Sequence, residues 1–261
     1  METPIFYRYK LQSGDQIAGP ALIVEAQTTT LLTPDFSAAV DGSGNIIIEC
    51  VGRQFAGVNA IQNHQQAGDL QTNQIELQIM WNRLLALVEE QGQVLIRTAF
   101  SPIVRECGDI SAGVFDLQGR MLAQAVTGTP GHINTMAEGV KYMLDYFPVD
   151  EMQPGDVYMT NDPWLAAGHL NDFFLVQPIF LNKTVVGYTS CTSHLIDLGG
   201  RGMGPEGSDI YDEGLLIPPC KLVDGGVVNE LLLQIVKANS REPIQNEGDT
   251  YALIACCEVG A

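Results

Sequence analysis

Short apolar runs separated by turn residues fill the first fifty positions of the chain. The runs ALIVEA, TTTLLT, FSAAVD and NIIIEC are rich in β-branched residues, and Gly-Pro, Pro-Asp and Gly-Ser-Gly-Asn separate them. Such runs, bounded by turn residues, are typical of strands. Residues 1–50 are therefore predicted to form a small all-β unit.

The apolar positions change to helical spacing after a polar stretch. Residues 51–72 are rich in Gly, Asn and Gln without a sustained period, which predicts a linker. A helix is expected to begin near Asn73, capped by Thr72 or Asn73. Its apolar face would consist of Ile75, Ile79, Leu84, Leu87, Val88 and Leu95.

From Cys107 onward, strand and turn signals alternate. The runs SAGVFD and RMLAQAV flank a turn at Leu-Gln-Gly, and Pro154-Gly-Asp leads into VYMTND. A second helix is expected from Thr135 to Tyr146. Residues 73–261 are thus predicted to form a mixed-sheet α/β domain, and the whole chain an α+β fold with a small N-terminal β unit.

Two His-x-x-Asp units flank a predicted β-hairpin in the second half of the chain. His169 and Asp172 precede the run FFLVQPIF, a turn at Leu-Asn-Lys and the run TVVGYTSCTS, after which His194 and Asp197 repeat the spacing. A hairpin brings its two ends together, so two imidazoles and one or two carboxylates would converge. Mn, Fe and Zn accept such ligands. The alternative is a set of hydrogen-bonded core residues.

Two further segments carry residues that could act in a site. Thr129-Pro-Gly-His132 presents a histidine in a turn before the predicted helix, and surface exposure is its alternative. The segment from Arg105 to Asp109 concentrates charge between apolar runs, as a local ion pair or a buried site would. The glycine-dense run after Asp197 lacks the Gly-Lys-Ser/Thr of a phosphate loop, so no nucleotide site is expected in this chain.

Composition narrows the possible partners. The chain of 261 residues carries 31 acidic and 13 basic residues, a net charge of −18, which excludes nucleic acid and anionic membranes as expected partners. No apolar run is long enough for a membrane span, and no signal core is recognised near the N-terminus. Six scattered cysteines without a Cys-x-x-Cys pair favour reduced thiols and a cytoplasmic location.

From about Thr72 to its end, the chain resembles the B component of the hydantoinase/oxoprolinase family. This family includes ATP-dependent N-methylhydantoinase, 5-oxoprolinase and the related acetone and acetophenone carboxylases. The resemblance is carried, in family order, by the runs LIRTAFSPIVRECGDISAGVFD, GHINTM, PGDVYMTNDPWLAAGHLNDFFLVQPIF, SHLIDLGG and IYDEGLLIPPCKL.

Residues 1–50 are similar to a different part of the family, the closing β segment of the A component. The run GDQIAGPALIVEAQTTTLLTPDFSAAVDGSGNIIIE carries this likeness, and an A tail joined to a B head resembles the junction of fused chains such as 5-oxoprolinase. The actin-like ATPase body of the A component and the later part of the B component have no counterpart here. The resemblance therefore implies either a subunit of a split enzyme or an incomplete chain. The expected partners are an A-like ATPase subunit and the remainder of the B component.

The resemblance also implies a reaction. In this family the A component phosphorylates a small-molecule substrate with ATP, and the B component completes ring hydrolysis or carboxylation at a metal centre. The hypothesis is an ATP-dependent cyclic amidase, inactive without its partners, which bind the ATP. The alternatives are a subunit of a ketone carboxylase and a noncatalytic assembly subunit.

The family motifs map onto particular residues of this chain. The implied ligands of one divalent metal (Mn, Zn or Fe) are His169, Asp172 and His194. Asp109 and His132 stand at family positions near them and, with Asp197, are the candidate catalytic residues. Asp197 is well placed in sequence to orient an imidazole. Two runs depart from the family pattern: AAGHLND stands where the family often has GGTHLPD, and Leu195 follows His194 where a second histidine is common.

Overall fold

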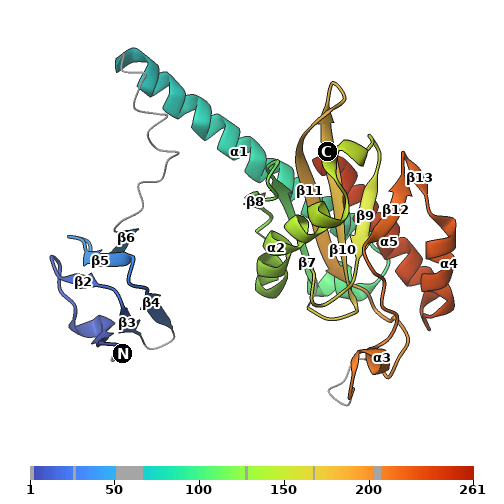
Figure 1. Cartoon of the computed structure of the whole chain (residues 1–261), viewed down its shortest axis with the longest axis horizontal. Coiled ribbons are helices and arrows are strands. Elements are labelled where there is room, and N and C mark those ends of the chain that lie inside the picture. Colours follow the sequence, from blue (N-terminus) through green and yellow to red (C-terminus); the bar gives the residue numbers. More distant parts are fainter. Residues whose placement is uncertain (1–2, 26–27, 51–66, 127–128, 167, 203–206) are drawn as a thin grey trace. The chain divides into compact units, whose positions relative to one another are not determined.

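The computed structural model describes residues 3–25, 28–50, 67–126, 129–166, 168–202 and 207–261. The chain divides into two compact units, Met1–Asn73 and Gln74–Ala261 (Figure 1). Each unit has its own apolar core among the described residues. The fold class is α+β, with small N-terminal sheets and one larger sheet, as the sequence predicts.

The N-terminal unit is built from two three-stranded sheets. One has the order β1-β3-β4 and includes a parallel pair, β1 with β3; the other has the order β2-β5-β6. The strands are β1 (Ile5–Tyr7), β2 (Gln16–Ala18), β3 (Ala21–Val24), β4 (Thr29–Leu32), β5 (Phe36–Val40) and β6 (Ile46–Cys50), with a short helix η1 (Arg8–Lys10) after β1. Alternate side chains bury Ile17, Ile23 and Leu32, which is the pattern of half-buried strands.

The long helix α1 (Ala67–Thr98) begins earlier than the sequence pattern predicts. The expected linker covers residues 51–72; residues 51–66 lie outside the described part, and residues 67–72 are helical, so the expected helix start near Asn73 is wrong. Ala, Leu and Gln in that stretch are good helix formers, but Gly, Asp and Thr stand between them and interrupt the apolar period. The boundary between the two compact units does fall at Asn73. The predicted apolar face is buried at Val88 and Leu95, but Ile75 is 60% exposed.

A seven-stranded sheet forms the centre of the second unit. Its order is β13-β12-β9-β10-β11-β7-β8, and every pairing between these described strands is antiparallel. The strands are β7 (Ile110–Phe115), β8 (Met121–Gln124), β9 (Val157–Thr160), β10 (Asp172–Leu181), β11 (Thr184–His194), β12 (Cys220–Asp224) and β13 (Val227–Val228). The mixed sheet predicted for residues 73–261 is therefore wrong: among the described strands, parallel pairing is found between β1 and β3 of the small unit.

The predicted hairpin is present as β10 and β11. Asn182 and Lys183 form its two-residue turn with φ angles of 50° and 68°, the geometry of a type I′ turn. The strands pair in register from the turn to Asp172, whose partner is His194, with one irregularity near Ile179. The hairpin therefore brings together the two ends that the sequence analysis expected to meet.

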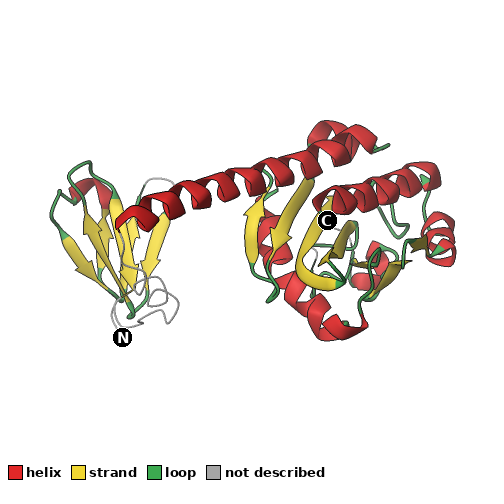
Figure 2. Ribbon diagram, turned by 90° about the horizontal axis from the view of Figure 1, so that it is seen from above, coloured by secondary structure: helices red, strands yellow, loops and turns green. Residues whose placement is uncertain are grey.

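Helices cover both faces of this sheet (Figure 2). Core residues of α1, α4 (Glu230–Ala238) and α5 (Pro243–Gly260) pack with Phe173 and Leu175 on one face. Core residues of α2 (Pro130–Tyr146) pack with Phe174 and Val176 on the other. Because both faces are covered, β10 reads as a continuous apolar run rather than an alternating one. The remaining short helices are η2 (Ile103–Cys107), η3 (Val149–Glu151) and α3 (Ile210–Glu213).

Helix α2 begins before the predicted start. Thr129 is its N-cap and Pro130 occupies the first turn, so His132 lies in the helix rather than in a turn that precedes it. Proline is favoured at the first helical position because its missing N–H has no helical partner there. Among the described residues, no helix is long and apolar enough to cross a membrane.

Candidate metal centre

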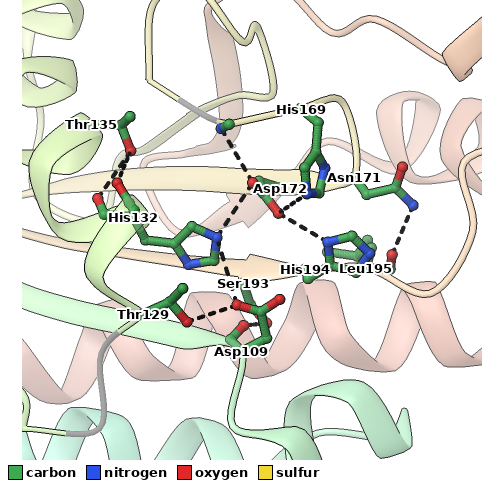
Figure 3. Close-up of polar contacts among 12 residues, drawn as sticks. Asp109, Thr129, His132, Thr135, His169, Asn171, Asp172, Ser193, His194 and Leu195 are labelled. Carbon is green, nitrogen blue, oxygen red and sulfur yellow. Dashed lines mark hydrogen bonds and ion pairs between the residues drawn. The ribbon is translucent and has the colours of Figure 1, made fainter. Parts of the chain in front are cut away.

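The candidate site lies at the open end of the β10–β11 hairpin, on the face covered by α2. Asp172 opens β10 and His194 closes β11, and residues paired across an antiparallel ladder share one face of the sheet. Asp172 also shares the face of Phe174 and Val176, because side chains alternate along a strand. Helix α2 packs on that face, and its first turn brings His132 toward Asp172 (Figure 3).

The Asp172 carboxylate is the centre of the cluster. Its Oδ1 lies 3.1 Å from His194 Nδ1 and 3.6 Å from His169 Nε2. Its Oδ2 lies 3.3 Å from His132 Nε2 and accepts a hydrogen bond of 3.2 Å from the Gly168 backbone N–H. Three of the four histidines of the chain therefore surround one buried carboxylate (Figure 3).

Three of these residues have the donor atoms and spacing of a metal site. One ligand atom each of His169, Asp172 and His194 lies within 4.8 Å of the other two. Two bonds of about 2.1 Å at tetrahedral or octahedral angles would place ligand atoms about 3.0–3.4 Å apart. The separations of 3.1 Å and 3.6 Å around Asp172 Oδ1 are close to that range. A bound ion would be held by two imidazoles and one carboxylate, with room left for other ligands.

Exposure differs among these three residues. The side chains of Asp172 and His194 are almost fully buried, whereas that of His169 is 47% exposed. The rings of His169 and His194 meet edge to face, with centroids 4.7 Å apart. Solvent can thus approach the cluster from the side of His169, which is the direction open to a small molecule.

Asp109 joins the cluster from the next strand. It directly precedes β7, and its carbonyl oxygen accepts a hydrogen bond of 3.2 Å from the His194 backbone N–H. Its carboxylate Oδ1 accepts a hydrogen bond of 2.7 Å from Thr129 Oγ1 and lies 3.7 Å from His132 Nε2. The predicted proximity of Asp109 and His132 to the ligand set is therefore present in the structure.

The protonation states in the cluster follow from burial and charge. Burial opposes charging of His132, but Asp172 and Asp109 outweigh it and raise the pKa of that imidazole. Burial lowers the pKa of His169, aided by the charge of His194 against the attraction of Asp172. Burial would raise the pKa of Asp172, but hydrogen bonds to His132 and His194 hold it well below its ordinary value. A neutral His169 and an ionised Asp172 are the forms that bind a metal.

The role predicted for Asp197 is wrong. Its carboxylate pairs with Arg241, with Oδ1 2.5 Å from Nη1, and also accepts from the Arg241 backbone N–H and from Ser240. Its carbonyl oxygen accepts from the Asn246 side chain. The His-x-x-Asp spacing does not predict the partner of Asp197, because Asp197 lies beyond the end of β11 and is not paired with a neighbouring strand. It ties that loop to the start of α5, and its hydrogen-bond partners among the described residues include no histidine.

Two contacts in the cluster were missed from the sequence. Thr129 donates to Asp109, and the backbone N–H of Gly168 donates to Asp172. A Thr before Pro at a helix start was the available signal for Thr129. A backbone donor such as Gly168 leaves no signal in residue type.

Comparison with known proteins places the chain in a family. The family model described as hydantoinase B/oxoprolinase matches residues 73–261. An uncharacterized protein of Methanocaldococcus jannaschii is 37% identical over 72% of this chain and 34% of its own length. The caprolactamase subunit beta of Pseudomonas jessenii is 32% identical over 71% of this chain and 32% of its own length.

Another relative also aligns with the N-terminal β unit. The 5-oxoprolinase PfmaA of Pestalotiopsis fici is 29% identical over 99% of this chain and 20% of its own length. The chain thus spans between about a fifth and a third of the length of these relatives.

Solved structures share the fold. The ATP-dependent caprolactamase of Pseudomonas jessenii has a TM-score of 0.65 and 31% identity, covering 71% of this chain and 32% of its own. A nucleotide-free acetone carboxylase has a TM-score of 0.63 over 70% of this chain and 24% of its own; at 23% identity it shows the fold alone. With the match over residues 73–261, the chain belongs to the hydantoinase B/oxoprolinase family.

Proposed function

We propose that this chain is the metal-bearing part of an ATP-dependent cyclic amidase, which opens the ring of a substrate that a partner A-type subunit has phosphorylated. The observation that carries the proposal is the convergence of His169, Asp172 and His194 within 4.8 Å. The residues fit a divalent ion of the Mn, Zn or Fe type, because imidazole and carboxylate suit these metals. Such an ion would polarise a carbonyl or activate water when bound.

The protein residues have distinct parts in this proposal. Asp172 and His194 are buried and held in one geometry by the strand ladder, so they would fix the position of the ion. His169 is half exposed and would complete the ligand set on the side open to the substrate. His132, which holds the second oxygen of Asp172, would keep that carboxylate from rotating.

Ring hydrolysis is preferred over carboxylation on the basis of the relatives. The caprolactamase from Pseudomonas jessenii is above 30% identical both as a sequence and as a structure, whereas the acetone carboxylase is 23% identical. The name of the first protein refers to a lactam, the class of substrate that a cyclic amidase opens. A ketone carboxylase stays the second candidate through its shared fold.

The proposed partner is an A-type ATPase subunit together with the rest of the B component. Two observations support this proposal. The caprolactamase relative is named as a subunit beta, and the 5-oxoprolinase relative aligns with nearly the whole chain over only a fifth of its own length. ATP would be bound by the partner, since the sequence of this chain carries no phosphate loop.

Metal analysis of the chain purified with its A-type partner tests the proposed centre. We expect about one equivalent of Mn, Zn or Fe, lost in His169→Ala and in His194→Ala. His64→Ala is the matched control, because His64 lies in the predicted linker, and it should keep the metal. Full metal content in His169→Ala and His194→Ala would refute the site, and a folded complex without metal would favour a noncatalytic assembly role.

Turnover by the assembled complex tests the reaction class. ATP hydrolysis should depend on a lactam or hydantoin and be accompanied by ring opening, detected as a new free carboxylate. Acetone or acetophenone with bicarbonate is the competing substrate set. ATP consumption that requires a ketone and bicarbonate, with no response to cyclic amides, would replace the amidase by a carboxylase.

A further inference from the structure

A pocket of about 410 Å³ lies beside the candidate metal centre. One wall includes Trp164 and Gly168, and the other is formed by α3 and the residues before it, including Asp209 and Glu213. Volumes of 300–1,000 Å³ are typical of small-molecule sites. The pocket is therefore large enough for one small ring compound.

Gly168 connects this pocket to the metal centre. It lines the pocket, and its backbone N–H donates to Asp172 Oδ2 at 3.2 Å. The next residue, His169, is the half-exposed member of the ligand set. A ring bound in the pocket would thus lie close to His169, on the solvent-exposed side of the candidate metal centre.

The pocket presents an aromatic surface to its contents. The side chain of Trp164 lines it and is 86% exposed, which is unusual for so large an apolar group. The backbone two residues further on is packed against helix α2, so closely that a Cβ on Gly139 would lie 2.8 Å from Ala166 Cβ. An exposed indole on a firmly packed segment is suited to stack against a flat or puckered ring.

The charges of the pocket have one sign. Asp209 and Glu213 line it, and its described lining contains no Lys or Arg. Arg201, the basic residue of the same loop, lies outside the described lining, with its Nε 3.4 Å from Asp212 Oδ1. The chain as a whole carries −18. Like charges brought together raise the free energy of binding, so the pocket would discriminate against a substrate with its own carboxylate.

We propose that this pocket binds the ring of a neutral cyclic amide on Trp164, and that Asp209 and Glu213 exclude cyclic amides that carry a carboxylate, such as 5-oxoproline. This inference rests on the proposed amidase function and narrows its substrate class. It assigns the aromatic wall to affinity and the two carboxylates to specificity.

A pair of ligands that differ in one group provides the test. 5-Oxoproline and 5-oxoprolinamide share the same ring, but the first is an anion and the second is neutral. Binding to the full chain is measured by fluorescence in a Trp81→Phe background, where Trp164 is the remaining tryptophan of the sequence. The neutral amide should bind at least about tenfold tighter than the anion, a difference of about 1.4 kcal/mol.

Charge variants identify the groups responsible. The double variant Asp209→Asn with Glu213→Gln should remove most of the tenfold gap by strengthening the binding of 5-oxoproline. Glu138→Gln is the matched control, because Glu138 lines a second hollow that Trp164 also borders. It should leave the gap unchanged. Calorimetry of Trp164→Ala should show weaker binding of the neutral amide.

Several results would overturn the inference. Equal or tighter binding of 5-oxoproline, a gap closed by Glu138→Gln alone, or unchanged affinity in Trp164→Ala would each do so, as would the absence of saturable ligand binding. These affinity measurements need no turnover, so their outcome is independent of the test of the proposed function. A chain that holds metal but prefers 5-oxoproline refutes this inference alone, and one that binds the amide without metal refutes the proposed function alone.

Discussion

At the scale of single residues, Asp172 is the point at which the candidate centre is assembled. Strand β10 carries it, β11 supplies His194, and α2 supplies His132. Each oxygen of the carboxylate has its own partners, which restrict rotation about its terminal torsion. The contribution of each partner can therefore be measured separately.

Substitution of His132 should weaken metal binding without abolishing it. His132→Ala removes the group that holds Asp172 Oδ2, and loss of such an orienting partner typically costs 10–100-fold in metal affinity. His132→Gln keeps a donor and should recover part of the loss. Competition with a chelator measures both affinities, and Asp172→Ala gives the reference for complete loss. An affinity in His132→Ala equal to that of the unmodified chain would contradict this role.

At the scale of elements, the hairpin turn holds two non-glycine residues at positive φ. Lys183 has a φ of 68°, a region in which L-residues other than Asn and Asp are disfavoured. A type I′ turn prefers Asn-Gly at its two central positions, and Asn182 already occupies the first. The turn is therefore a position at which one substitution should increase stability.

Lys183→Gly should stabilise the second unit by up to about 1 kcal/mol, because relief of the left-handed strain exceeds the entropy cost of glycine. Lys183→Val should be destabilising, since a β-branched residue fits this conformation least. Thermal unfolding of the two variants, followed by circular dichroism, measures both effects. A lower midpoint for Lys183→Gly than for the unmodified chain would contradict the assigned turn geometry.

A buried carboxylate links β9 to β12 and makes this part of the sheet sensitive to acid. Asp156 accepts hydrogen bonds from Gly225 N, Gln153 N and Tyr158 Oη, and lies 2.9 Å from Lys221 Nζ. Burial would raise its pKa, but these donors together hold the pKa below the ordinary value of 3.8. The folded state therefore binds this proton less readily than the unfolded state does.

The stability contributed by Asp156 should be fully present above pH 3.8 and be lost as the pH falls through its lowered pKa. Asp156→Asn should cost about 1–3 kcal/mol at neutral pH, the usual cost of disrupting buried hydrogen bonds. In this variant the free energy of unfolding should also depend less on pH in the acidic range. Urea unfolding between pH 3 and 7 tests this, with the exposed Asp150→Asn as the control. Parallel pH profiles for the unmodified chain and Asp156→Asn would refute the assignment.

The same scale shows how far the sequence predicts the structure. The hairpin and the meeting of Asp172 with His194 were predictable, because strand runs and a turn define a register. The start of α1 and the partner of Asp197 were not. Gly and polar residues among the first positions of α1 interrupt its apolar period, and a carboxylate beyond the last ladder residue can pair with Arg241, which lies far along the chain. Contacts set by packing between distant segments have no local pattern.

At the scale of the whole molecule, the two units have separate cores. Ile23 is fully buried in the first unit and Leu253 in the second. Domains with their own cores usually unfold as separate cooperative transitions. The proposed metal ligands lie in the second unit, so a bound ion should stabilise that unit alone.

Calorimetry of the full chain should show two transitions. Ile23→Ala should lower one of them and Leu253→Ala the other, each by about 2–5 kcal/mol of unfolding free energy. Added Mn or Zn should raise the transition that responds to Leu253→Ala. A single transition lowered equally by both variants would show that the units unfold together.

The loop that carries α3 begins and ends at one place in the fold. The Leu215 backbone N–H donates to Leu198 O at 3.0 Å, and the Arg201 N–H donates to Asp212 O at 2.9 Å. A side chain at Gly214 would lie 2.5 Å from Leu198 O, which fixes glycine at this junction. A segment closed in this way can be exchanged as a cassette without disturbing the sheet. Relatives could thus diverge in substrate preference by replacing the middle of this loop, between the family runs SHLIDLGG and IYDEGLL, while the proposed metal ligands at the open end of the β10–β11 hairpin stay constant.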